Sequence, residues 1–226
     1  MKNCASGDFL SQHSKNDTDL ISVVEQGLVY KASEKLSRIP DRLSSGLPEL
    51  DYFFEGGLPF SAITECGMPL GLEGRFVLLH FLANGTRHVS PPLWVLWISS
   101  YQELEIFPPA WMAHGVALDQ IVFAYSKKPM QDLKRAILHH LFKIIIFDAP
   151  PHMDQDDFTF LCQRARENNQ AIIVLRDFFL TNKQGNVWAS LRFNCARNPT
   201  TNDYVLTGLK GFRKKWFLFS PQRIGM

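Results

Sequence analysis

The chain has 226 residues, of which 46% are hydrophobic and 20% are charged. This composition excludes a disordered chain, and the length fits one α/β domain with a short appendage. The formal net charge of +2 does not by itself indicate a nucleic-acid partner. Four widely spaced cysteines without a C-x-x-C pair predict free thiols, and neither zinc nor a disulfide framework. The polar start lacks an apolar signal region and no run is long enough to span a membrane, so we expect a cytoplasmic protein without membrane contact.

Two regions are expected. Residues 1–40 form an N-terminal arm that contains a helix, and residues 41–226 form a core domain. The helix is predicted over 19–35, where Leu20, Val24 and Leu28 form one apolar stripe. One interpretation is a helix that packs on its own domain. Pro40 separates the helix from the core, because the residue before a proline is disfavoured in helical conformation.

From residue 43 onward the pattern alternates between apolar strands and amphipathic helices. Such alternation predicts an α/β fold in which helices flank a mostly parallel sheet. We expect strands over 61–65, 93–98, 121–125, 143–148 and 171–175, and helices over 75–84, 109–114, 130–142 and 154–168. In the helix over 130–142, the residues expected to face inward are Leu133, Ile137, Leu138 and Leu141. Three further alternating segments, 191–194, 204–209 and 216–219, predict a β-rich C-terminal edge.

A glycine-spaced loop follows the first of these strands. Residues 67–75 read GMPLGLEGR, and strand, glycine loop and helix form the layout of a phosphate-binding P-loop. Compared with G-x-x-x-x-G-K-[ST], Gly67 is kept, but Leu72, Glu73 and Gly74 replace the second Gly, the Lys and the Ser/Thr. A carboxylate at the Lys position repels phosphate by roughly 4 kcal/mol for like charges about 4 Å apart at an effective dielectric near 20. Arg75 offers partial compensation, so weak binding of ATP and Mg²⁺ stays open.

Asp148 ends the most apolar strand and precedes Ala149-Pro150. A carboxylate at the carboxyl end of a parallel strand has the Walker B form, because ligands of open α/β sheets bind at that edge. In a working ATPase it would help to hold Mg²⁺. The alternative is an ordinary strand-terminal Asp that caps the next turn.

The opening of the core carries a family resemblance. The segment LSSGLPELD at 43–51, the corner Gly56-Gly57-Leu58-Pro59 and the strand ending in Glu65 and Gly67 resemble the start of the RecA core. The closest pattern is that of the ImuA family, RecA-like accessory proteins of the bacterial translesion mutagenesis cassette with a decayed P-loop. The resemblance runs from about residue 43 to residue 219.

This resemblance implies a RecA-like P-loop NTPase core whose nucleotide site is vestigial. The vestigial residues would be Gly67, Gly71, Glu73, Gly74, Arg75 and Asp148, with no catalytic residue, no metal cluster and no resident cofactor. It also puts Tyr101 where RecA-type enzymes carry the Glu that activates water. A Tyr is a poor general base at neutral pH, because its reference pKa is about 10. ATP turnover is therefore not expected.

Two stretches are candidates for contact with single-stranded DNA. RecA-type cores bind it through loops after the later strands, which implies a contact at 181–189, where Lys183 and Trp188 offer charge and stacking. A second candidate is the alternating basic and aromatic cluster of Lys210, Arg213, Lys214, Lys215 and Trp216. The alternatives are a plain surface loop and a solvated hairpin turn.

By resemblance, the function is that of a catalytically degenerate adaptor in the SOS DNA-damage response. Its expected partners are RecA, an error-prone polymerase complex, the sliding clamp and single-stranded DNA. The resemblance also implies that the N-terminal helix contacts a neighbouring protomer, with Leu20, Val24 and Leu28 as candidate partner-binding residues. Two alternatives stay open. One is an active, DNA-stimulated ATPase that uses Arg75 or a displaced Lys, and the other is an SOS cell-division inhibitor, although such an inhibitor need not retain the full opening signature.

Overall fold

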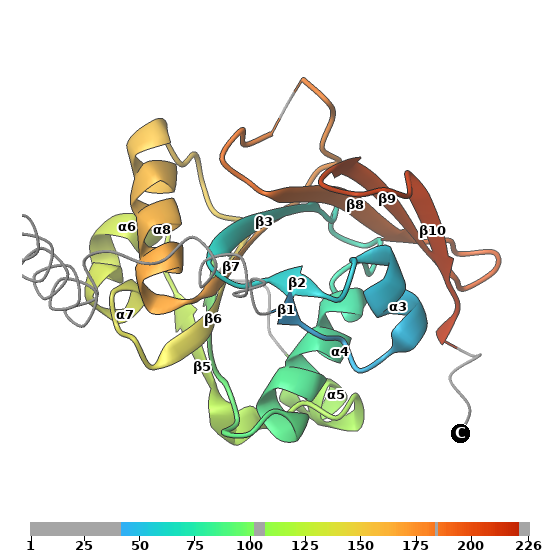
Figure 1. Cartoon of the computed structure of the whole chain (residues 1–226), viewed down its shortest axis with the longest axis horizontal. Coiled ribbons are helices and arrows are strands. Elements are labelled where there is room, and N and C mark those ends of the chain that lie inside the picture. Colours follow the sequence, from blue (N-terminus) through green and yellow to red (C-terminus); the bar gives the residue numbers. More distant parts are fainter. Residues whose placement is uncertain (1–41, 102–106, 184, 222–226) are drawn as a thin grey trace, which may run out of the picture. The chain divides into compact units, whose positions relative to one another are not determined.

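The structure is a computed structural model that describes residues 42–101, 107–183 and 185–221. Within these residues an eight-stranded sheet has the order β10-β9-β8-β3-β7-β6-β4-β5 (Figure 1). The six strands from β8 to β5 run parallel, whereas β9 and β10 are antiparallel additions at one edge. The strand bounds are β3 Ala62–Gly67, β4 Trp94–Ser99, β5 Ile121–Tyr125, β6 Phe142–Asp148, β7 Ala171–Arg176, β8 Leu191–Arg197, β9 Tyr204–Lys210 and β10 Trp216–Phe219.

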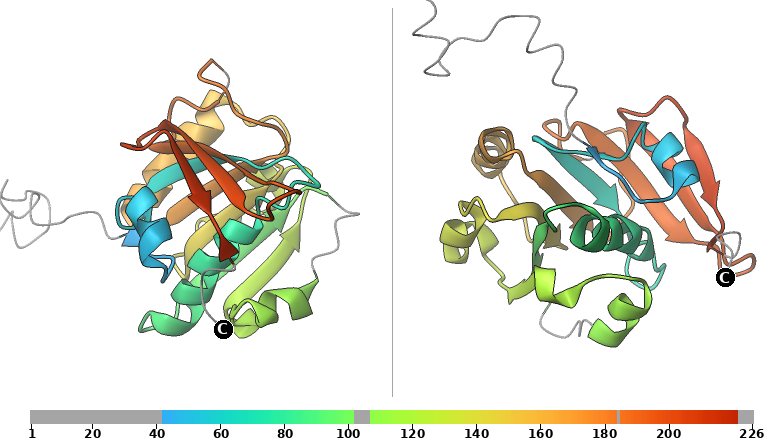
Figure 2. Two further views of the ribbon diagram at one scale, coloured as in Figure 1. Left: turned by 90° about the vertical axis from the view of Figure 1, so that its right-hand side faces the viewer. Right: turned by 60° about the horizontal axis from the view of Figure 1, so that its bottom comes forward.

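Helices cover both faces of the parallel part of the sheet (Figures 1 and 2). One face carries α3 Pro48–Phe53, α4 Phe76–Ala83 and α5 Pro108–Ala113, and α4 continues into a π-helical turn, η1 Asn84–His88. The other face carries α6 Pro129–Asp132, α7 Lys134–Ile137 and α8 Gln155–Asn168. A short 3₁₀ turn, η2 Leu118–Gln120, precedes β5, and β1 Arg42–Leu43 pairs antiparallel with β2 Leu58–Pro59. The expected α/β fold with a mostly parallel sheet and a β-rich C-terminal edge is confirmed.

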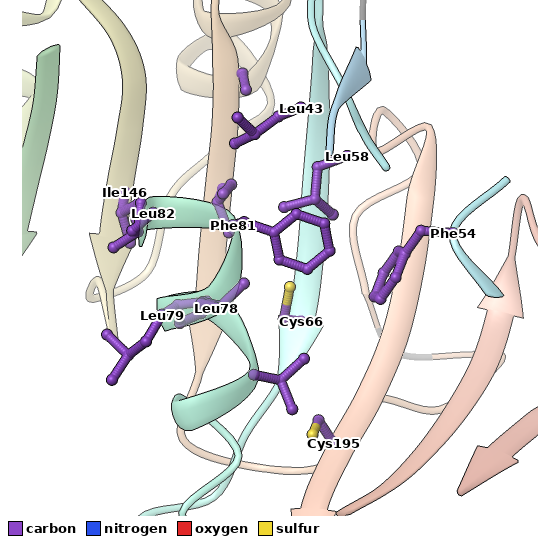
Figure 3. Packing of buried hydrophobic residues seen from close by; sticks show 14 of the residues in the cluster. Leu43, Phe54, Leu58, Cys66, Leu78, Leu79, Phe81, Leu82, Ile146 and Cys195 are labelled. Atoms are coloured by element: carbon purple, nitrogen blue, oxygen red, sulfur yellow. The ribbon is translucent and has the colours of Figure 1, made fainter. Parts of the chain in front are cut away.

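Strand β6 shows why the core strands read as unbroken apolar runs. Ile144 and Ile146 belong to the core on the α4 side, whereas Ile145 and Phe147 belong to the core on the α8 side. A strand that is buried on both faces needs apolar residues at every position. On the α4 side, Figure 3 shows Leu82 beside Ile146, whereas Phe81 points toward Leu58 and Cys66.

The opening signature has a structural role in the described molecule. The Asp51 carboxylate accepts hydrogen bonds from the Ser44 hydroxyl at 2.5 Å, and from the backbone N–H and hydroxyl of Ser45 at 2.7 and 2.8 Å. Gly57 has φ 122°, and a Cβ there would lie 2.2 Å from the carbonyl oxygen of Leu43. The Ser-Ser-Gly turn and the Gly-Gly corner are therefore required by local packing and hydrogen bonding.

The prediction of one continuous helix over 130–142 is wrong. The segment forms the short helices α6 and α7, because Leu133 between them has φ −111° and ψ 14°, outside helical values. Ile137 is buried as expected, but Leu138 and Leu141 are 36% and 40% exposed. The helix expected over 19–35, with Leu20, Val24 and Leu28, lies outside the described residues.

Candidate functional site

The carboxyl ends of four parallel strands bring the predicted site residues to one edge of the sheet. The glycine loop follows β3, Tyr101 lies just beyond β4, Asp148 is the last residue of β6, and Asp177 follows β7. Ligands of open α/β sheets bind at this edge. The structure therefore brings Gly67, Arg75 and Asp148 into one region, as the sequence predicts.

Arg75 and Asp148 form an ion pair across this edge. The guanidinium Nε and Nη2 atoms donate to one carboxylate oxygen, Asp148 Oδ1, at 2.9 and 2.6 Å. The third nitrogen, Nη1, donates to the carbonyl oxygen of Met68 in the glycine loop at 2.9 Å. The Asp148 side chain is 3% exposed and that of Arg75 is 19% exposed. Arg75 thus compensates the charge of Asp148, and it binds one oxygen of the carboxylate that a Walker B role would direct to Mg²⁺.

Glu73, in the same loop, is paired with Arg197 and not with Arg75. It has φ 51°, in the left-handed region, and its carboxylate accepts a hydrogen bond from the guanidinium of Arg197 on β8. The backbone N–H of Arg197 also donates to the carbonyl oxygen of Leu72 at 2.8 Å. Glu73 and Arg75 therefore have different partners, because Arg197 pairs with Glu73 and Asp148 pairs with Arg75.

Two glycines of the loop are required by close packing. A Cβ on Gly67 would lie 2.1 Å from Asn194 Oδ1, and a Cβ on Gly74 would lie 2.4 Å from the carbonyl oxygen of Cys195. Gly71 has φ 79° and faces open space. A Ser or Thr at position 74, which a P-loop uses to hold Mg²⁺, would clash with the backbone of β8.

Tyr101 is held in its protonated form. Its hydroxyl donates a hydrogen bond to the carboxylate of Asp177. This hydrogen bond, together with burial, raises the pKa of Tyr101. Removing the phenolic proton would remove the hydrogen bond, so Tyr101 does not act as a general base near neutral pH.

A small hollow of about 290 Å³ lies beside the Arg75–Asp148 pair. Its volume is at the lower end of that of ligand pockets. Aromatic rings form much of the wall, with the ring centroids of Phe76 and His114 4.6 Å apart and those of Trp97 and Trp111 4.8 Å apart. Arg75 and Asp148 give the hollow a polar side whose charges are already matched.

The sequence reasoning missed a buried charge cluster around Glu65. This β3 side chain is 1% exposed, and its carboxylate accepts hydrogen bonds from Arg176 Nε at 2.9 Å and from the backbone N–H of Asn186 at 2.6 Å. Arg192 Nε lies 3.5 Å from the second carboxylate oxygen. A Glu inside an otherwise apolar strand was the available signal, because a buried carboxylate needs partners. The cluster fastens the segment between β7 and β8 to the sheet.

The candidate nucleic-acid residues fall into two groups. Lys183 and Trp188 belong to the segment between β7 and β8, and Lys210 Nζ donates to the carbonyl oxygen of Val187 in that segment at 2.7 Å. Arg213, Lys214, Lys215 and Trp216 belong to the β9–β10 hairpin, where Lys214 Nζ lies 4.4 Å from the ring centroid of Tyr52 on α3. Lys210 is thus the member that connects the hairpin to the segment.

No family model matches the sequence, and a search of curated proteins finds no match either. In the described part of the chain, no group of three or more His, Cys, Asp or Glu side chains is placed to hold a metal ion. None of the described helices is both long and apolar enough to cross a membrane.

Proposed function

We propose that this chain is a catalytically silent, RecA-like adaptor of the ImuA type, which acts in the SOS DNA-damage response and supports error-prone translesion synthesis through protein contacts. The observation that carries the proposal is the ion pair of Arg75 with Asp148. It lies at the strand edge where a P-loop protein holds its metal–nucleotide complex, and it uses the carboxylate that the metal would need.

The energetics of this ion pair favour a silent site. Binding of MgATP through Asp148 would require Arg75 to leave a nearly buried carboxylate. Breaking a buried ion pair costs about 3–5 kcal/mol, which corresponds to roughly a hundred- to several-thousand-fold loss of affinity. The loop offers no Lys to offset this cost, and the Gly74 position has no room for a hydroxyl side chain. An adaptor role needs no nucleotide turnover, so it is compatible with a strand edge at which Arg75 is paired with Asp148.

Contact with single-stranded DNA belongs to the same proposal and has its own observation. A hollow of about 710 Å³ lies between the residues that follow β6 and those that follow β7. Arg176 and His152 line it with the half-exposed rings of Phe178 and Phe179, and the buried Asn186 Nδ2 has no hydrogen-bond partner among the described residues. Nitrogen donors beside aromatic rings suit phosphate contact and base stacking.

Titration of the full chain with MgATP by isothermal calorimetry, followed by a hydrolysis assay with and without single-stranded DNA, tests the silent site. We expect no saturable heat and no hydrolysis. DNA-stimulated hydrolysis would overturn the proposal in favour of the ATPase alternative.

The adaptor role is tested by capture of the tagged chain from DNA-damaged cells, with bound proteins identified by mass spectrometry. Recovery of RecA, the sliding clamp or an error-prone polymerase supports it. Recovery of the tubulin-like division protein alone would favour the division-inhibitor alternative.

DNA contact is tested by the anisotropy of a labelled oligo-dT. We expect Phe178→Ala to weaken binding about five- to hundredfold, because stacking contributes about 1–3 kcal/mol per base. The matched control is Tyr125→Ala on β5, which removes an exposed aromatic ring that does not line this hollow. Equal binding by the wild type and Phe178→Ala would remove DNA from the proposal.

A further inference from the structure

We propose that the free edge of β10 is a docking site for an extended, acidic segment of a partner protein, which joins the sheet as an additional strand. This inference deepens the adaptor function by naming how a partner is held, and to that extent it rests on the proposed function. The surface itself lies on the β9–β10 hairpin, apart from the Arg75–Asp148 edge in the strand order.

Strand β10 is the outermost strand on its side of the described sheet, shown in red in Figure 1. Among the described strands it pairs only with β9, with Trp216 opposite Thr207 and Leu218 opposite Val205. The N–H of Gly208 donates to the carbonyl oxygen of Lys215 at 2.8 Å. Lys215 is thus a residue whose backbone is hydrogen-bonded to β9. Residues that are and are not hydrogen-bonded to the neighbouring strand alternate in an antiparallel ladder, so the backbone N–H and C=O groups of Trp216 and Leu218 face away from β9, toward the outer edge.

A hollow of about 460 Å³ follows this edge and is lined by consecutive residues, Lys214, Lys215, Trp216, Phe217 and Leu218. Successive side chains of a strand point to opposite faces of the sheet. A hollow that touches every residue in turn therefore runs along the edge of the strand, and not over one face. An extended peptide that pairs with the backbone occupies such a position.

The side chains of β10 divide into an inner and an outer set. Phe219 is 1% exposed, and Phe217 stacks on Phe53 of α3 with ring centroids 5.4 Å apart. Trp216 and Leu218 are 69% and 46% exposed. The edge strand therefore exposes an apolar side chain at every second position. An added strand with apolar residues at alternate positions would cover these side chains.

Charge determines the chemistry of the partner. The hairpin segment 210–216 carries four basic residues and no acidic one. Glu55, which follows α3, lies 3.6 Å from Arg213, and Lys214 lies over the Tyr52 ring. Among the described residues, Lys215 forms no ion pair. A second hollow of about 400 Å³, lined by Tyr52, Glu55, Arg213 and Lys214 among others, adjoins the first at Lys214. The excess positive charge at the start of β10 selects a segment with carboxylates at that end.

A protein strand fits this surface better than a nucleic acid does. Trp216 and the lysines could contact either a protein or a nucleic acid. The outward backbone groups and the aliphatic side chains of Leu218 and Val205, however, suit strand pairing and not contact with phosphates or bases. Nucleic acid is therefore kept as an outcome of the test.

The test uses the full chain and the anisotropy of a short fluorescein-labelled peptide in which Glu alternates with Val and Leu. We expect saturable binding that weakens as salt is added. Two control peptides are matched to it, one with Lys in place of each Glu and one with the same sequence N-methylated at alternate residues. Neither should bind, because the first reverses the charge and the second removes the donors for strand pairing.

Three variants locate the binding site. Lys215→Glu should weaken binding about three- to tenfold and flatten its salt dependence, as a charge at the rim of an interface does. Leu218→Pro removes an outward N–H and should abolish binding, whereas Leu218→Ala keeps that N–H and should retain part of the affinity. Circular dichroism of each variant checks that the sheet remains folded, and peptide-induced change of the Trp216 indole NMR signal, assigned with Trp216→Phe, reports contact in the wild-type chain.

Three results would overturn the proposal: equal binding of the N-methylated peptide, an unmoved Trp216 signal, or hairpin variants that lose oligo-dT binding without losing peptide binding. The proposal would also be overturned if Lys215→Glu self-associates while its affinity for the peptide is unchanged. The function of the lysines would then be to prevent the edge strand from pairing with another chain. Peptide binding together with ATP hydrolysis would contradict the silent site and leave the docking site standing.

Discussion

The guanidinium of Arg75 donates two hydrogen bonds to a single oxygen of the Asp148 carboxylate, at 2.9 and 2.6 Å, across the carboxyl edge of the sheet. Its third nitrogen holds the carbonyl oxygen of Met68. One side chain therefore connects the glycine loop to the end of β6. The edge that typically receives a ligand in an open α/β sheet is here closed by the chain's own cation.

Arg75→Ala leaves the Asp148 carboxylate nearly buried without its cation. We expect a loss of about 3–5 kcal/mol in the free energy of unfolding, because an uncompensated buried charge is costly. Urea denaturation followed by circular dichroism measures the loss. The double variant Arg75→Ala with Asp148→Asn should recover a large part of it, and additive losses would contradict the coupling.

Glu73→Lys restores the signature residue of a P-loop but should not restore nucleotide binding. Asp148 keeps Arg75, and the position of Gly74 still excludes a hydroxyl side chain. The lost contact with Arg197 involves a Glu73 side chain that is 54% exposed, so the stability should fall by only about 0–1 kcal/mol. Calorimetric titration with MgATP decides the matter, and tight binding by this variant would show that Arg75 is not the barrier.

Gly74→Ala and Gly71→Ala form a matched pair within one loop. A Cβ at Gly74 meets the Cys195 carbonyl oxygen at 2.4 Å, so the backbone must shift and we expect a loss of about 1–3 kcal/mol. At Gly71 nothing lies within 4 Å, but φ is 79°, so only the conformational cost of about 1–2 kcal/mol applies. Thermal unfolding should rank Gly74→Ala as the less stable variant. The reverse ranking would mean that the loop backbone can move away from β8 at little cost in free energy.

Glu65→Gln removes the charge that two arginines share while nearly preserving the shape of the side chain. The segment between β7 and β8 should open more readily, because the Asn186 N–H and the Arg176 guanidinium then contact a neutral amide. Limited proteolysis is the measurement, with cleavage within 178–190 expected to accelerate. Glu167→Gln, on the exposed side of α8, is the control and should leave the rate unchanged. An unaltered rate in Glu65→Gln would contradict the anchoring role.

His80 should make the protein less stable as the pH falls toward 4. Burial, with a further effect of His114, lowers the pKa of His80 from 6.5 to about 4. The unfolded chain takes up this proton near pH 6.5 and the folded chain only near pH 4, so acidification between these values favours unfolding, by about 3 kcal/mol at most. Denaturation at pH 7 and pH 4.5 measures the difference. The non-titrating variant His80→Gln should show a smaller difference, and an equal one would assign the effect to other groups.

The sequence alone predicted the α/β class and the order of the core elements. The central runs of β4, β6 and β7, which are 94–98, 144–147 and 171–175, are apolar at every position, and a strand buried on both faces requires this pattern. The strand predictions over 121–125 and 216–219 coincide with β5 and β10. The helix over 130–142 was wrong, because an amphipathic period does not reveal a backbone break such as the one at Leu133.

The sequence also placed Gly67, Arg75 and Asp148 in one candidate site, because the ends of parallel strands meet at one edge. Only the tertiary structure decided how their charges are matched. Arg75 and Asp148 lie 73 positions apart, and Glu73 and Arg197 lie 124 apart. Periodicity and motif spacing describe neighbours along the chain, whereas an ion pair depends on which strands the sheet brings together. The pairing of charges, and with it the closed edge of this protein, is a property of the strand order β8-β3-β7-β6.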